Sequence, residues 1–311
     1  MQHTNRRAFL TLSAAAALQS SLAARLTAAE RSSFRLAITT DEIDDDITVA
    51  AGFLKRFGIK HCEIRGYWGK YNTSQPIERA HEARQILDDA GIKLAILDTG
   101  FFKVGVPDLT TVDGKKALDK QWALLDKAFE RADIMGTKLI RTFAFTYRRG
   151  ETPSRLHYPW IYEQVQESAA RAKKAGFRLA LENVGGSYVA TAAHSADLLK
   201  AVKHPALGLT WDPNNSAQSG DKEPYPAGYK MLDANRIHHV HVRDYKYNAD
   251  GSADWCGVGD GDFDHVGQLQ AFLKDGYQGV VSLETHFKID DSKAKASEYS
   301  IKALLEIIER V

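Results

Sequence analysis

The chain has 311 residues, of which 44% are hydrophobic and 26% charged, and its formal net charge at pH 7 is +1. This length and composition can bury a large core, and the near-neutral charge gives no reason to expect a nucleic acid or an anionic membrane as partner. Only two cysteines, Cys62 and Cys256, are present, which excludes a disulfide framework. No Pro/Ser-rich linker divides the chain, so we expect one α/β domain rather than two.

The first 29 residues resemble an export signal. Arg6 and Arg7 precede an Ala-rich, mildly apolar stretch, and residues 27–29 offer a small-residue cleavage site. The pattern is similar to a twin-arginine signal, although Asn5 stands in place of the usual Ser or Thr; an ordinary secretory signal is the alternative. No later stretch approaches the ~20 apolar residues of a membrane span. We therefore expect an exported, periplasmic protein whose mature domain covers residues 30–311.

Short apolar runs alternate with helical patterns along the rest of the chain. The predicted strands are 35–39, 61–65, 94–98, 139–145, 178–183, 207–212, 237–243 and 280–285. The predicted helices are 47–57, 77–90, 115–135, 160–175, 195–202, 227–232, 266–275 and 293–310. Eight such pairs predict a (β/α)₈ TIM barrel, in which chemistry gathers at the carboxyl ends of the strands. An open doubly wound sheet is the competitor, but no Gly-rich phosphate turn follows the first strand.

Four consecutive predicted strands end on a residue that can bind a divalent metal: Glu182, Asp212, His241 and Glu284. A carboxylate or imidazole in such a place is costly unless it is paired or coordinated. Three carboxylates and one imidazole suit Mn²⁺ or Mg²⁺, with Co²⁺ and Zn²⁺ as further options. The alternative is four unrelated polar strand ends, each bonded locally.

A metal in this position would polarise a carbonyl and the adjacent hydroxyl of a sugar, which favours loss of the proton between them. Glu182 and Glu284 are the candidate bases. His286, two residues after Glu284, projects to the same side of its strand and is either a proton donor or a structural histidine.

At these residues the chain resembles the xylose isomerase-like superfamily, in particular its sugar phosphate isomerase/epimerase branch. The matching motifs are Leu-Glu182-Asn, Trp-Asp212-Pro-Asn, Val-His241-Val-Arg-Asp244 and the segments 40–43, 63–68, 259–264 and 276–286. The resemblance covers nearly the whole mature chain. It implies a TIM barrel with a metal on the same four residues, but not one substrate, because the superfamily includes isomerases, epimerases, dehydratases, eliminating enzymes and endonucleases.

Three positions depart from the pattern of related ketohexose epimerases, which carry His, Glu and Arg where this chain has Asn215, Tyr188 and Tyr247. Simple epimerisation of a free ketohexose is therefore disfavoured. The extra metal ligands of the nuclease relatives are also missing from the sequence. The resemblance implies a sugar isomerase or epimerase, and elimination from a 3-keto-glycoside is the alternative, since sugar phosphates are scarce outside the cytoplasm. A non-catalytic sugar-binding barrel is a third hypothesis.

Further residues near the predicted strand ends are candidate contacts for a small carbohydrate. They are Glu63, Arg65, Trp68, Lys103, Arg141, Asn183, Trp211, Asn215, His239 and Trp255. Aromatic rings stack on the apolar C–H faces of sugars, and charged groups bind hydroxyls. For each there is a structural alternative: Glu63 with Arg65 can fill the barrel, Arg141 can form a buried ion pair, and the tryptophans can pack in the core. Assembly into a homo-oligomer is left open.

Overall fold

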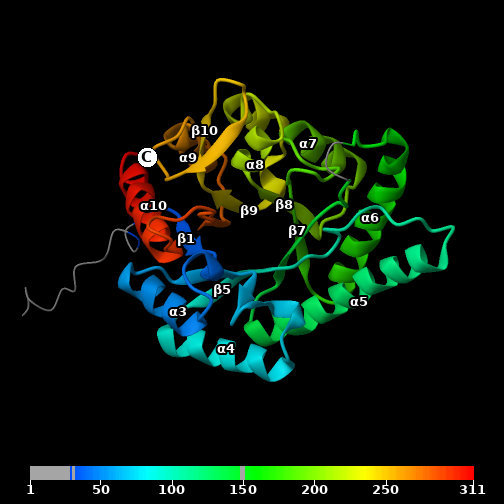
Figure 1. Ribbon diagram of the computed structural model, residues 1–311, viewed down its shortest axis with the longest axis horizontal. Helices are drawn as coiled ribbons and strands as arrows, with labels where there is room; N and C mark the ends of the chain where they lie inside the picture. The colour runs from blue at the N-terminus through cyan, green and yellow to red at the C-terminus, as the bar shows by residue number, and fades with distance from the viewer. Residues whose placement is uncertain (1–28, 30–31, 148–150) are drawn as a thin grey trace, which may run out of the picture.

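Eight parallel strands form the centre of the protein in a computed structural model that describes residues 29, 32–147 and 151–311 (Figure 1). Their order is β1-β12-β9-β8-β7-β6-β5-β2, and a parallel bridge between Thr39 and Glu63 joins the two edges. The strands are β1 (Arg35–Ile38), β2 (His61–Ile64), β5 (Lys93–Asp98), β6 (Leu139–Thr142), β7 (Arg178–Glu182), β8 (Leu207–Trp211), β9 (Ile237–Val242) and β12 (Val280–Leu283). The predicted TIM barrel is confirmed. The predicted export signal lies outside the described residues, apart from Ala29.

Helices surround the barrel on its outer side (Figure 1). They are α3 (Ile47–Arg56), α4 (Ile77–Ala90), α5 (Val112–Met135), α6 (Tyr158–Lys174), α7 (Ala192–Ala201), α8 (Pro213–Gln218), α9 (His265–Lys274) and α10 (Lys293–Ile308). Local signals set their ends: the side chains of Asp46 and Thr111 cap α3 and α5, and Gly91 ends α4 in a left-handed conformation with φ 71°.

Two predicted elements differ from the structure. The α-helix predicted at 227–232 is replaced by a short π-helical segment, η4 (Pro224–Gly228), and a 3₁₀ helix, η5 (Tyr229–Met231). In addition, α8 begins directly after β8. Its start is favoured because the Asp212 carboxylate accepts hydrogen bonds from the backbone N–H groups of Asn214 and Asn215. The strand predicted at 139–145 ends at Thr142, and Phe145 has a left-handed φ of 54°, which no strand accommodates.

Two antiparallel hairpins, which the sequence patterns did not predict, follow barrel strands. One pairs β3 (Gly66–Tyr67) with β4 (Lys70–Tyr71), and the other pairs β10 (Asp244–Tyr247) with β11 (Ala253–Cys256). The Asp244 carboxylate accepts hydrogen bonds from the backbone N–H groups of Gly259 and Gly261 and so orders the segment after the second hairpin. A Cβ on Gly261 would lie 2.2 Å from Asp244 Oδ1, so only glycine fits there.

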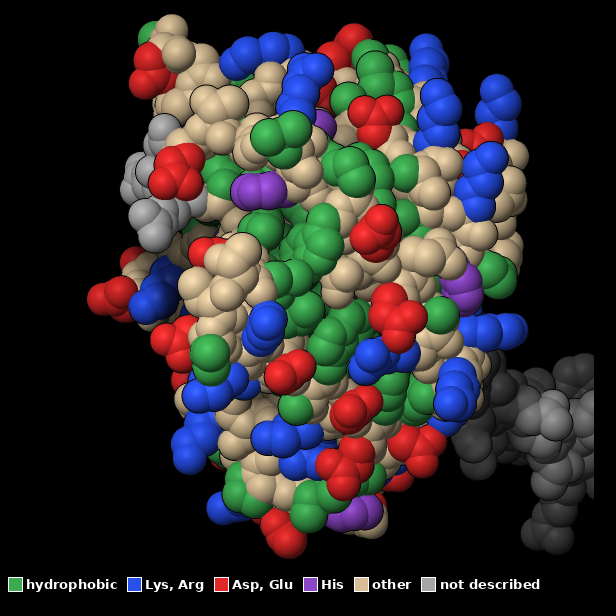
Figure 2. Space-filling view, turned by 90° about the vertical axis from the view of Figure 1, so that its right-hand side faces the viewer, with side chains coloured by type: hydrophobic (Ala, Val, Ile, Leu, Met, Phe, Trp, Pro, Cys, Tyr) green, Lys and Arg blue, Asp and Glu red, His purple; other side chains and the backbone are tan. Residues whose placement is uncertain are grey.

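The described part of the chain contains no helix long and apolar enough to cross a membrane. On the side of the barrel that α5 and α6 cover, hydrophobic side chains form a band between charged ones (Figure 2). Beside α5, a hollow of about 440 Å³ is lined by apolar side chains, among them Val104, Leu118 and Phe145, together with polar and charged ones.

We expect Gly208→Ala to destabilise the protein, because a Cβ at this position in β8 would lie 2.4 Å from the backbone oxygen of Arg236 and 2.6 Å from the ring of His238. The free energy of unfolding, measured with a denaturant, should fall by about 1–3 kcal/mol. Gly52→Ala is the matched control. A Cβ added at this position inside α3 has no neighbouring atom within 4 Å, so the free energy of unfolding should rise by about 0.5–1 kcal/mol. Equal stability of the two variants would contradict the tight contact between β8 and β9.

Candidate metal centre and active site

The four residues predicted as metal ligands meet at one point at the carboxyl end of the barrel. One potential ligand atom from each of Glu182, Asp212, His241 and Glu284 lies within 4.8 Å of the others, and all four side chains are buried. His241 Nδ1 lies 3.4 Å from Glu182 Oε1, 3.7 Å from Asp212 Oδ2 and 3.2 Å from Glu284 Oε2. The structure therefore brings these residues together from four neighbouring strands.

The donor atoms of this group fit a divalent metal. His241 Nδ1 has no hydrogen-bond partner in the described part of the chain, although it is fully buried and faces three carboxylates. Burial alone would lower the pKa of His241, but Glu63, Glu284 and Glu182 outweigh it and raise the pKa well above its ordinary value. The site thus stabilises positive charge at Nδ1, which either a proton or a metal cation can supply.

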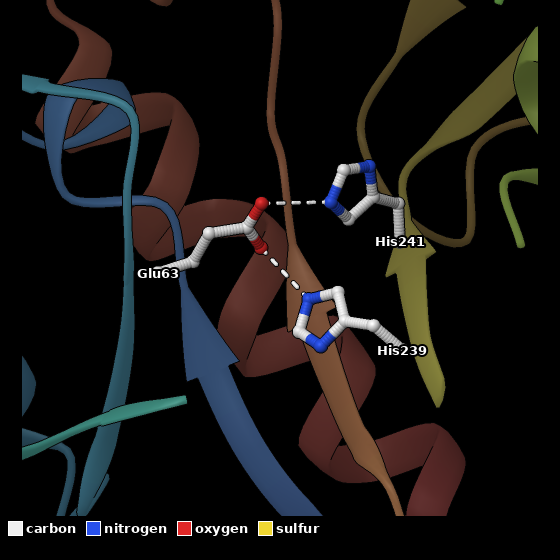
Figure 3. Close-up of side chains that lie close together, drawn as sticks. All are labelled: Glu63, His239 and His241. Atoms are coloured by element: carbon white, nitrogen blue, oxygen red, sulfur yellow. Dashed lines mark hydrogen bonds and ion pairs between the residues drawn. The ribbon is translucent and has the colours of Figure 1, made fainter. Parts of the chain in front are cut away.

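Glu63 orients this imidazole from below. Its carboxylate, on β2, lies between two histidines of β9 and contacts His241 Nε2 at 2.8 Å and His239 Nε2 at 2.9 Å (Figure 3). Burial raises the pKa of Glu63, but the two histidines lower it by more. The pKa of Glu63 therefore lies well below its ordinary value. An ionised Glu63 accepts a hydrogen bond from the Nε2–H of His241 and leaves Nδ1 free for a metal, the arrangement found around many metal-bound histidines.

Three arginines surround the acidic group. Arg141 Nη1, on β6, lies 3.1 Å from Glu182 Oε2, and Arg65 Nη1 lies 2.9 Å from Glu284 Oε1. Arg243 contacts both Asp212 and Glu284. Burial raises the pKa of each of these three carboxyl groups, yet nearby positive charge outweighs it: the pKa of Glu182 falls chiefly through Arg141, and those of Asp212 and Glu284 chiefly through Arg243. The three carboxylates are therefore ionised, as metal ligands or proton acceptors must be.

A polar cavity of about 560 Å³ lies over this group. Its walls include five of the predicted substrate contacts and the three predicted catalytic residues: Arg65, Lys103, Arg141, Asn215, Trp255, Glu182, Glu284 and His286. Lys103 Nζ lies 4.6 Å from the centre of the Phe143 ring, and burial lowers its pKa. The cavity is the right size for a small carbohydrate.

The other five predicted contacts do not line this cavity. Glu63 and His239 are completely buried below His241. Trp211 faces the helices, because it follows the inward-facing Thr210, and its Nε1–H donates to Gln268 of α9.

The remaining two are also held by neighbours. Asn183 bonds through its side chain to the backbone N–H and carbonyl of Asp212, and Trp68 packs against Tyr67 and under Arg79. These residues support the site from outside the cavity.

His286 faces the cavity from the loop after β12 and is 31% exposed on its side chain. Its Nδ1 lies 3.2 Å from Glu42 Oε1, and its Nε2 lies 3.8 Å from Glu284 Oε1. The ring of Trp255 lies across from it, with a centroid distance of 6.3 Å. This placement leaves an imidazole available to a bound molecule.

The sequence patterns missed several residues of the site. Arg243, Tyr71 and Gln218 line the cavity, and a fully buried Asp98 lies 3.0 Å from Arg141 Nη1. Burial raises the pKa of Asp98 well above its ordinary value despite that arginine. Two of these residues could have been found from the sequence. Asp98 ends a predicted strand, as the candidate metal ligands do, and Arg243 lies two residues after His241 and so projects to the same side of the strand.

The chain belongs to the xylose isomerase-like TIM barrel family, whose model matches residues 52–308. This confirms the resemblance inferred from the motifs. The family includes enzymes with different reactions, so membership defines the fold but neither the reaction nor the substrate.

Individual similar proteins illustrate that range. A 3-dehydroshikimate dehydratase of Pseudomonas putida is 25% identical over 199 residues, which is 60% of this chain but only 30% of the length of that protein. A xylose isomerase-like TIM barrel protein from Mycobacterium smegmatis, solved in complex with magnesium, superposes with a TM-score of 0.66 at 18% identity, over 91% of this chain and 98% of that one. The 3-keto-D-glucoside 4-epimerase from E. coli superposes with a TM-score of 0.65 at 17% identity, over 88% and 98%.

We expect Glu63→Gln to weaken metal binding by about 10–100-fold. The amide nitrogen of glutamine donates hydrogen bonds, so residue 63 would no longer offer an accepting oxygen to each of the two histidines and would no longer fix the His241 tautomer. The dissociation constant for Mn²⁺, measured by calorimetry, tests this directly. Glu306→Gln, which removes an exposed carboxylate on α10, is the control and should bind Mn²⁺ as the unmodified protein does. Unchanged Mn²⁺ affinity of Glu63→Gln would remove Glu63 from the metal centre.

Proposed function

We propose that the protein is a metal-dependent isomerase or epimerase that removes the proton next to a carbonyl group of a polyhydroxylated substrate. The observation that carries this proposal is the convergence of Glu182, Asp212, His241 and Glu284, of which Glu182 and Glu284 line a polar cavity. A divalent metal bound to these residues would supply the polarisation that makes such a proton acidic. We propose Mn²⁺ or Mg²⁺ as the bound metal, with Co²⁺ or Zn²⁺ as alternatives.

The residues of the cavity divide the remaining work. Glu182 or Glu284 accepts the proton as the C–H bond breaks, and the electron pair forms the enediolate of the substrate. When the former carbonyl carbon takes up a proton and a proton moves from the adjacent hydroxyl to the former carbonyl oxygen, the carbonyl group is transferred and an isomer forms. Return of the proton to the opposite face of the original carbon gives an epimer. Arg65 and Lys103 bind substrate oxygens, and Trp255 offers a ring for the apolar face of a sugar.

Elimination is the second candidate, and the similarity to a dehydratase together with the position of His286 favours it. In this reaction the same base removes the proton next to the carbonyl, a carbon–carbon double bond forms, and the carbon–oxygen bond one atom further on breaks. The departing oxygen needs a proton, which His286 at the cavity wall can donate. For a 3-keto-glycoside, the departing group is the substituent at C1.

Incubation with keto-sugars and 3-keto-glycosides in D₂O distinguishes the reactions. Deuterium at the carbon next to the carbonyl in an isomeric product supports isomerisation or epimerisation, and release of the C1 substituent supports elimination. Binding without either outcome supports a non-catalytic sugar-binding barrel. A protein that binds no metal when Mn²⁺ and Mg²⁺ are supplied in excess contradicts the proposed chemistry.

We expect Glu182→Gln and Glu284→Gln each to lower the rate of deuterium incorporation by about 10²–10⁴-fold, since each removes a proton acceptor from the cavity. Far-UV circular dichroism should be unchanged because both replacements conserve volume. Glu306→Gln should exchange deuterium at the normal rate. Retention of the full exchange rate in both Glu182→Gln and Glu284→Gln would exclude these residues as bases.

We also propose that residues 1–29 direct export to the periplasm, since paired arginines precede an apolar stretch. Replacement of both Arg6 and Arg7 by lysine conserves charge but should retain the protein in the cytoplasm of a bacterial host. Cell fractionation with an antibody measures this. Undiminished export of the double variant would rule out the twin-arginine route.

A further inference from the structure

A second, larger cavity lies at the opposite end of the barrel. It has a volume of about 810 Å³, and its wall includes the first residues of several strands, among them Arg35 of β1 and Val280 of β12. The metal ligands lie at the other ends of the strands. The proposed reaction uses no residue that faces this cavity, apart from His239, which supports the metal centre through Glu63.

Basic side chains stand at the start of five consecutive strands around this cavity. In barrel order, from β1 through β2, β5 and β6 to β7, these residues are Arg35, His61, Lys93, Lys138 and Arg178. His61 and Lys93 are direct neighbours in the strand register. One continuous arc of the barrel rim is therefore basic, although the charge of the whole chain is close to zero.

Little negative charge balances this arc. Within the described residues, Arg35, Lys93 and Arg178 form no ion pair, whereas Lys138 pairs with Asp133 and Arg84 with Asp88. The other acidic residue at the cavity, Asp275, accepts a hydrogen bond from the hydroxyl of Tyr229. Three cations at the cavity, Arg35, Lys93 and Arg178, thus have no ion-pair partner among the described residues.

Two histidines on the cavity wall respond to this charge. Burial lowers the pKa of His61, and Arg35 and Lys93 lower it further. Burial lowers the pKa of His238 to about 4, with a further contribution from Arg178. The positive field that disfavours a second proton on these rings would attract an anion.

A layer of buried side chains separates the two cavities. His239 forms part of the wall of the lower cavity and His241 faces the metal centre, and the Glu63 carboxylate bridges them (Figure 3). A molecule in the lower cavity therefore cannot contact the metal ligands. Any ligand bound there is distinct from the substrate.

We propose that the cavity at the amino-terminal ends of the strands binds a small polyanion through Arg35, Lys93 and Arg178. Phosphate and carboxylate groups both satisfy these side chains, since guanidinium groups bind either in a bidentate manner. The volume falls within the range of small-molecule sites. The site would add a binding function to the barrel that does not depend on its reaction.

Calorimetry on the metal-free protein tests the proposal with two probes, inorganic pyrophosphate and citrate. We expect one site per chain, with affinity that decreases as sodium chloride is added. Tighter binding of pyrophosphate identifies phosphate as the natural group, and tighter binding of citrate identifies carboxylate. Absence of binding by both probes at low ionic strength overturns the proposal.

Variants locate the site. Lys93→Gln/Arg178→Gln should weaken binding by about tenfold or more, as expected for two lost charge-assisted contacts. Lys116→Gln/Lys127→Gln removes the same charge from exposed positions of α5 and should have no comparable effect, while Lys93→Arg keeps the charge and should retain binding. Both side chains of the test pair are exposed, so the fold should be preserved.

The cavity over the metal centre is also basic, so Lys103→Gln provides the comparison. Loss of binding in Lys103→Gln with normal binding in Lys93→Gln/Arg178→Gln would place the anion at the metal centre and overturn the proposal. If Lys116→Gln/Lys127→Gln weakened anion binding as much as Lys93→Gln/Arg178→Gln, the binding would reflect general charge attraction rather than a site. That result would also overturn the proposal.

Discussion

The structure depends on the balance of charge at the carboxyl end of the barrel. Glu63, Glu182, Asp212 and Glu284 are all withdrawn from water, which would be very costly for uncompensated anions. Arg141, Arg243 and Arg65 stand beside the last three, and two histidines stand beside Glu63. The compensation is strong enough to keep the carboxyl groups ionised.

This balance explains why the site can bind a cation and still perform proton transfer. The arginines hold the carboxylates from the sides, so the carboxylates converge without mutual repulsion separating them. Glu63 holds the imidazole of His241 at Nε2, and the buried Nδ1 faces the three carboxylates without a hydrogen-bond partner among the described residues. A metal would join the arrangement at the point where His241 and the three carboxylates converge, without requiring a new set of side chains.

The candidate active site and the second cavity lie at opposite ends of the barrel. Glu63 and its two histidine partners separate the candidate metal centre from the other end of the barrel, where five of the eight strands begin at or just after a basic residue that lines the second cavity. The two ends of the barrel therefore differ in how their charges are balanced. The carboxyl ends hold buried acids that are matched by arginines, whereas the amino ends hold three exposed cations, Arg35, Lys93 and Arg178, that form no ion pair among the described residues. This asymmetry distinguishes the proposed anion site from the reaction site.

The amino-acid sequence by itself determined the eightfold alternation and the four candidate metal ligands, because both depend on local patterns: apolar runs of strand length, helical periodicity, and polar residues at strand ends. The sequence did not determine how deeply each side chain is buried or which side chains it contacts. Whether Glu63 meets a substrate or an imidazole depends on how β2 and β9 face each other across the barrel, and no local pattern records that. Likewise, Arg35 and Arg178 are far apart in sequence, and only the closing of the sheet places them around one cavity. The tertiary structure decided these relations because they arise from strand order and register, which join distant parts of the chain.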